Sequence, residues 1–183
     1  MSIFEFLGLD KKPPPASEAD TQTVRKITAA LDRLEPDRAR YIAGFAYILS
    51  RVSHADLNIG PEEIRAMESL IVERGGLPEA QAVLVVQMAK TQSLLFGGTE
   101  NFLVTRQFSK IASRDEKLAL LDCLFAVSSA DQSISVVEDN EIRQIASELR
   151  LEHADFIAAR SRYRQHLSVL QKQKPGVRSQ DTE

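Results

Sequence analysis

The sequence predicts an all-α protein, a compact bundle of about eight helices. From residue 21 onward, apolar residues recur at spacings of three and four, which is the period of an amphipathic helix. No segment alternates apolar and polar residues over the length of a half-buried strand. The 183 residues include only 8 glycines and 7 prolines, and this scarcity favours long helices over a sheet rich in turns.

The first helices are marked by their apolar faces and by the breaks between them. One face runs from Val24 to Leu34 and a second from Ile42 to Val52, and Glu35-Pro36 separates them. Gly60-Pro61-Glu62-Glu63 begins the next helix, because proline suits the first helical position and acids suit the positive end of the helix dipole. Gly75-Gly76 should end this helix, since one glycine can adopt the left-handed cap.

Helical patterns continue through the second half. Phe96-Gly97-Gly98 interrupts the pattern, and Ser113-Arg114-Asp115-Glu116 has the serine and glutamate spacing of a capping box at a helix start. The remaining helices are expected over residues 78–90, 99–112, 118–127, 137–149 and 154–170.

The helical domain is expected over residues 21–170, with a different kind of segment on each side. Residues 1–20 combine the apolar stretch Met1–Leu9 with a linker that carries three consecutive prolines and is expected to be stiff and solvated. Residues 171–183 are polar and are expected to be disordered.

Charge and cysteine content exclude several classes of protein. A formal net charge of −3 leaves no basic stripe for displacing counterions from phosphates, so nucleic acid is not expected as the main partner. A single cysteine, Cys123, excludes an internal disulfide and fits a reducing compartment. The sequence has no run of roughly 18 apolar residues and no basic region before its first apolar stretch, so we expect a cytoplasmic protein.

Catalytic motifs are missing. Cys123 lies in an apolar helical pattern, which predicts a buried and inert thiol. His54, His153 and His166 do not have the spacing of a helical metal site, and the glycine pairs lack the pattern of a phosphate-binding loop. The sequence therefore predicts a protein that is not an enzyme.

An internal repeat is the feature that points to a site. Ala55-Asp56-Leu57-Asn58-Ile59-Gly60 recurs as Ala130-Asp131-Gln132-Ser133-Ile134-Ser135, each copy lying between an apolar helix and an acidic helix start. Glu63 matches Glu141 if three residues are inserted in the second copy. The repeat is too long for a solenoid unit and indicates a duplicated half-domain.

The paired loops offer oxygen donors for a divalent cation such as Ca²⁺ or Mg²⁺, which requires six or more oxygens, partly from water. Two loops that converge would supply enough of them. The alternative is that the aspartates organise turns and the glutamates stabilise helix starts. The candidate ligands are Asp56, Asn58 and Glu63 in the first copy and Asp131, Ser133 and Glu141 in the second, with Glu62 and Glu138 nearby.

Two apolar features are candidates for protein partners. The first is Ile3, Phe4, Phe6 and Leu7, which could dock in a groove of the same domain, bind a partner or rest on a membrane interface. Glu5 and Asp10, without basic anchors, argue against membrane binding by this segment alone. The second is a stripe on the last long helix, for which core packing is the commoner role: Phe156, Tyr163, Leu167 and Leu170.

The paired Ala-Asp loops and the tract from Glu141-Ile142-Arg143-Gln144-Ile145-Ala146 to Asp155-Phe156-Ile157-Ala158-Ala159-Arg160 resemble the bacterial tellurite-resistance B-like (TerB-like) family, over residues 21–163. The resemblance implies a helical domain of two pseudo-symmetric halves, an acidic metal-binding site and a role in stress-response or membrane-associated complexes. The family loop usually reads Ala-Asp-Gly. Here Leu57 and Gln132 replace the glycine, and a side chain restricts positive φ.

Overall fold

Helices account for almost all of the chain that the structure describes. The computed structural model describes residues 18–52, 61–91, 101–130 and 132–171. Within these ranges, helices and one isolated parallel bridge between Ile134 and Leu167 make up the secondary structure, which confirms the all-α prediction. No helix in the same ranges combines the length and apolar character needed to cross a membrane. The elements are α2 (Glu18–Leu31), α3 (Pro36–Val52), α4 (Pro61–Glu73), α5 (Glu79–Lys90), α7 (Asn101–Ile111), α8 (Arg114–Ser128), α9 (Val136–Glu148), α10 (His153–Arg162), a 3-10 turn (Arg164–His166) and α11 (Ser168–Gln171).

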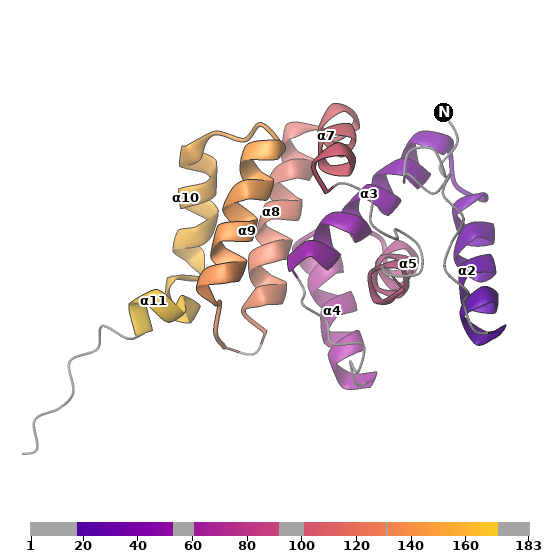
Figure 1. Cartoon of the computed structure of the whole chain (residues 1–183), viewed down its shortest axis with the longest axis horizontal. Coiled ribbons are helices and arrows are strands. Elements are labelled where there is room, and N and C mark those ends of the chain that lie inside the picture. Colours follow the sequence, from indigo (N-terminus) through magenta and orange to yellow (C-terminus); the bar gives the residue numbers. More distant parts are fainter. Residues whose placement is uncertain (1–17, 53–60, 92–100, 131, 172–183) are drawn as a thin grey trace, which may run out of the picture.

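α3 is the central helix of the bundle. Its residues are buried from Tyr41 through Val52, and α5, α7, α8 and α9 pack around it (Figure 1). α3 and α7 approach closely at Gly44, where an added Cβ would lie 2.7 Å from Cδ2 of the buried Phe108. This helix crossing therefore requires glycine.

α8, α9 and α10 lie side by side, on the side of α3 that is opposite α2 and α5 (Figure 1). α10 packs on α8 and α9, and the Phe125 ring lies 5.8 Å from that of Phe156 and 5.7 Å from that of Tyr163. Between the two parts of the bundle, α3 packs against α9 and α4 packs against α8. Such an exchange of contacts is what a two-fold relation between α3–α4 and α8–α9 would produce, and the relation itself stays a prediction.

Several predicted helix ends agree with the structure. The Ser113 hydroxyl accepts from the Glu116 backbone N–H at 3.2 Å, and the Glu116 carboxylate accepts from the Ser113 N–H at 2.8 Å, which confirms the capping box. α4 ends at Glu73, and Gly76 has the expected left-handed backbone with φ +67°. α2 begins at Glu18, within the stretch that we expected to be linker.

The expected single helix over residues 154–170 is wrong. α10 ends at Arg162, and α11 begins only at Ser168. The Ile134 N–H donates to the His166 carbonyl at 2.6 Å, and the Ser168 N–H donates to the Ile134 carbonyl at 3.0 Å. These backbone bonds require an extended residue at Leu167, with ψ 114°, so the helix is interrupted there.

Candidate functional site

The described residues include only part of the predicted cation site. Glu62 lies exposed in the first turn of α4, and Glu63 follows it in the same helix. Ser133 is half-buried in the connection between α8 and α9, and Glu138 and Glu141 lie on α9. The convergence of the two loops stays a prediction. Outside the described residues lie the predicted ligands Asp56, Asn58 and Asp131 and the predicted partner-binding residues Ile3, Phe4, Phe6 and Leu7.

Glu138 caps α9. Its carboxylate accepts from the Ser135 backbone N–H at 2.8 Å, and the Ser135 hydroxyl accepts from the Glu138 N–H at 3.2 Å. This reciprocal capping box satisfies two N–H groups at the positive end of the helix dipole. The Ser135–Glu138 spacing was present in the sequence, and sequence analysis did not recognise it as a cap.

Gln132 has the backbone conformation that glycine would adopt more easily. Its φ is +68°, and its N–H donates to the Ser129 carbonyl at 2.9 Å. A left-handed conformation costs a residue with a Cβ about 1–2 kcal/mol. The second loop therefore keeps a left-handed turn at this position although glutamine replaces the expected glycine.

Glu141 is paired with Arg51, which lies in the last turn of α3. The Arg51 side chain is only 2% exposed, and its Nε lies 2.8 Å from a Glu141 carboxylate oxygen. The same guanidinium lies 2.6 Å from the Glu148 carboxylate and donates to the Thr105 hydroxyl at 2.7 Å. We call these four residues the Arg51 cluster, and they connect α3, α7 and α9.

The pKa values within the Arg51 cluster favour the charged forms. Burial alone would lower the pKa of Arg51, but the hydrogen bond and charge of Glu148, with those of Glu141, raise it above its ordinary value. Burial alone would raise the pKa of Glu148, but hydrogen bonds from Arg51 and Gln144 lower it. The charged form of Arg51 stabilises the charged form of Glu148, and the reverse also holds.

The Arg51 cluster limits what Glu141 can do. A cation bound by the Glu141 oxygen that Arg51 contacts would have to displace the guanidinium, which would cost the buried arginine one of its two carboxylate partners in the Arg51 cluster. No group of three or more histidine, cysteine, aspartate or glutamate side chains in the described ranges is arranged to hold a metal ion. Arg51 was not among the residues predicted from the sequence. The available signal was an arginine within an apolar helical face, next to Val52 and three residues after Ile48.

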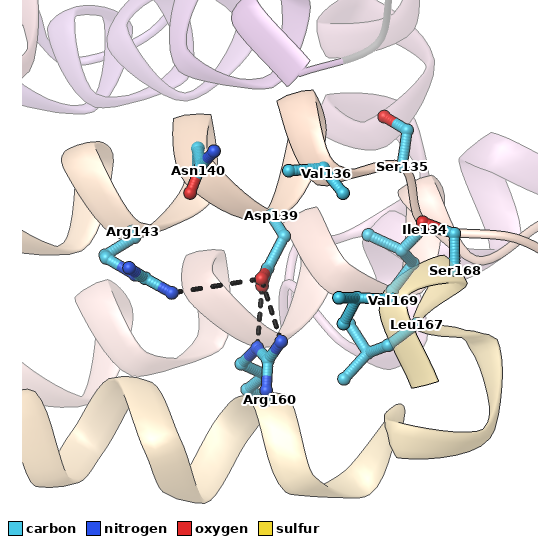
Figure 2. Close-up of a pocket in the computed structure, with 10 residues that line it drawn as sticks. All are labelled: Ile134, Ser135, Val136, Asp139, Asn140, Arg143, Arg160, Leu167, Ser168 and Val169. Atoms are coloured by element: carbon cyan, nitrogen blue, oxygen red, sulfur yellow. Dashed lines mark hydrogen bonds and ion pairs between the residues drawn. The ribbon is translucent and has the colours of Figure 1, made fainter. Parts of the chain in front are cut away.

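On the opposite side of α9, Asp139 pairs with α10. The Arg160 guanidinium approaches the Asp139 carboxylate with two nitrogens, at 2.8 and 2.9 Å, and Arg143 lies 4.0 Å away (Figure 2). The hydrogen bonds to Asp139 raise the pKa of Arg160. Arg143 also lies over the Phe156 ring, 5.4 Å from its centroid. These contacts fix two arginine side chains beside a hollow in the surface.

Two hollows adjoin at this place, because both are lined by Arg160 and Leu167. The first, between the start of α9 and α11, has a volume of about 200 Å³ (Figure 2), and the second, between α10 and α11, has a volume of about 280 Å³. We call them together the α10–α11 groove. Its lining includes apolar residues and arginines: Val136, Ile157 and Val169, and Arg143, Arg160 and Arg164.

Cys123 and the apolar stripe of the C-terminal helices belong to the core of the bundle. Cys123 is buried, and burial raises the pKa of its thiol to about 12, so the predicted buried thiol is confirmed. Phe156, Tyr163 and Leu167 are buried and Leu170 is half-buried against the core, which confirms the core-packing role of the stripe.

Comparison with known proteins gives one finding. The family model described as "Tellurite resistance protein TerB" matches residues 41–161. No curated protein and no solved structure matches the chain. The matched residues begin in α3 and end in α10, so they include the Arg51 cluster and most of the helical bundle.

Proposed function

Because this chain belongs to the TerB family, we propose that it is a non-catalytic helical module that binds a protein partner. In this proposal the acidic side chains around the second loop stabilise the fold and do not hold a metal ion. The observation that carries the proposal is that the carboxylates of Glu138 and Glu141 both contact other residues of this chain. Glu138 caps α9, and Glu141 pairs with the buried Arg51.

The state of the reactive side chains supports a role without catalysis. The Cys123 thiol is buried and its pKa is raised to about 12, so almost no thiolate is present near neutral pH. The acids of α9 have structural partners: Glu138 caps the helix, Glu141 pairs with Arg51, and Asp139 pairs with Arg160.

Binding of a partner is supported by exposed apolar side chains. Val136, Ile157 and Val169 are exposed on α9, α10 and α11, and they line two adjoining hollows. Apolar side chains grouped in this way indicate an interaction surface more than scattered ones do. We propose that this surface places the module in a complex, and the family resemblance points to a stress-response or membrane-associated one.

A divalent cation at the paired loops is the second candidate function. It is favoured by the left-handed backbone of Gln132, which keeps the turn expected of the Ala-Asp-Gly loop. In this case the ligands would be Asp56, Asn58, Glu63 and Asp131, since Glu141 already has a partner.

Thermal unfolding of chelator-treated protein with added Ca²⁺, Mg²⁺, Mn²⁺ or Zn²⁺ separates the two candidates. A ligand of the native state at a hundredfold its dissociation constant adds about 2.7 kcal/mol of stability. We expect no shift with any of the four ions, and the same result for the double variant Asp56→Asn, Asp131→Asn. A shift that one ion produces and the double variant lacks would contradict the proposal and establish the cation site. The matched control is Glu79→Gln, which removes an exposed acid from the start of α5 and is not among the candidate ligands.

A further inference from the structure

The α10–α11 groove is an apolar hollow with basic side chains at its edge, and the surrounding helices leave it open. We propose that it binds the N-terminal segment, residues 1–10, of a second copy of this chain. The inference rests on the proposed function, because it names the partner of the interaction surface.

The apolar part of the groove is formed by side chains that the bundle does not cover. Ile157 of α10 is 46% exposed and Val169 of α11 is 45% exposed, and Val136 at the start of α9 is 53% exposed. Figure 2 shows Val136 and Val169 on one side of the first hollow, with Leu167 below them. Covering these side chains would remove apolar surface from water, which favours an apolar occupant.

The charge of the groove favours an acidic occupant. Its charged lining residues are Arg143, Arg160 and Arg164 against Asp139 alone, a formal excess of two positive charges. Asp139 is already bound bidentately by Arg160. The other cations that an incoming carboxylate would meet are Arg164 and Arg143, which lies 4.0 Å from Asp139 and over the Phe156 ring.

The N-terminal segment has the chemistry that such a groove requires. Ile3, Phe4, Phe6 and Leu7 supply bulky apolar side chains, and Glu5 and Asp10 supply carboxylates. No lysine or arginine occurs before Lys11. The apolar side chains of the segment therefore fit the apolar lining of the groove, and its negative charges are complementary to the arginines of the groove.

The length of the chain favours a second copy over the same copy. Figure 1 places α2 at one end of the long axis and α10 and α11 at the other. A domain the size of residues 18–171 is about 40 Å across. The stretch from Lys11 to Ser17 reaches at most about 25 Å when fully extended, and within one copy it would have to pass around the bundle. Two copies that exchange their segments form a closed two-fold dimer without this restriction.

Sedimentation velocity of the full chain over a concentration series tests the proposal. We expect a dimer that dissociates on dilution, and we expect Phe4→Ser with Phe6→Ser, or Ile157→Asp with Val169→Asp, to weaken it by roughly tenfold or more. The matched control is Leu103→Asp, since Leu103 is 49% exposed on α7 and outside the groove. Circular dichroism checks that each variant keeps its helix content.

One mixture and one pair of charge reversals make the assignment specific. The segment variant mixed with the groove variant should restore association, because one intact segment then meets one intact groove. Arg164→Glu and Glu5→Lys should each weaken the dimer, and the two changes together should recover part of it.

The inference would be overturned by a chain that stays monomeric at all concentrations. It would also be overturned if Leu103→Asp weakened the dimer as much as the segment or groove variants do. Binding of anionic phosphatidylserine vesicles by a monomer, lost in the segment variant, would overturn it in favour of a membrane. Neither result bears on the cation titration, so failure of this inference is distinguishable from failure of the proposed function.

Discussion

Arg51→Met tests whether the Arg51 cluster stabilises the fold. We expect the free energy of unfolding to fall by about 3–5 kcal/mol near neutral pH, because the change removes one partner of a buried ion pair. The Glu148 side chain is 7% exposed and loses a contact of 2.6 Å, and Glu141 loses one of 2.8 Å. Methionine occupies a volume similar to that of the arginine stem, so the loss should come from the unpaired carboxylates more than from a cavity.

The pH dependence identifies the cause of the loss. In the wild type, Glu148 has a pKa below its ordinary value of 4.5, so its contribution is present above that value and disappears as the pH falls through the lowered pKa. Without Arg51, burial remains and should raise the pKa of Glu148 above 4.5. The variant then gains stability as the pH falls through the raised pKa, and the difference between variant and wild type narrows toward about pH 4.

Urea unfolding followed by circular dichroism at several pH values measures both effects. The control is Arg114→Met, which breaks an ion pair of 2.8 Å whose arginine is 58% exposed, and it should cost less than about 1 kcal/mol. If Arg51→Met costs no more than this control, or if the difference does not narrow in acid, the argument from buried charge is refuted.

Substitutions at three further positions test local features by thermal unfolding. Ser135→Ala should cost about 1 kcal/mol by removing the cap of α9, and equal melting temperatures would show that the cap contributes nothing. Gln132→Val should cost about 1–2 kcal/mol because a β-branched residue resists φ +68°, whereas Gln132→Gly should not destabilise, and the reverse order would contradict the left-handed turn. Gly44→Val should cost about 2 kcal/mol by forcing α3 away from Phe108, and a variant as stable as the wild type would mean that this crossing can relax.

The helices could be predicted from the sequence because their signals are local. The spacing of apolar residues, the Ser113–Glu116 pair and Gly75-Gly76 each act within a turn or two of the chain. The division of the last helix could not be predicted in the same way. It depends on backbone bonds from Ile134 to His166 and from Ser168 to Ile134, and no property of the helix's own sequence reports them.

The candidate site was predicted only in part for a similar reason. The repeat drew attention to Glu138 and Glu141, and both lie on α9. Their roles depend on partners that the repeat does not contain. Arg51 is 90 residues from Glu141 and 97 from Glu148, so their pairing follows from the packing of α3 against α9.

Arg51 also shows how the two copies of the repeat differ. The offset that aligns Ala55-Asp56 with Ala130-Asp131 places Ala126 at the position of Arg51, and alanine has no guanidinium to offer. In the second copy, Glu141 is neutralised by an arginine that comes from the first copy. For Glu63 the sequence supplies no arginine at the corresponding place. For the cation candidate, this difference favours the first copy, with Asp56, Asn58 and Glu63, because the sequence places alanine where a counterpart of Arg51 would stand.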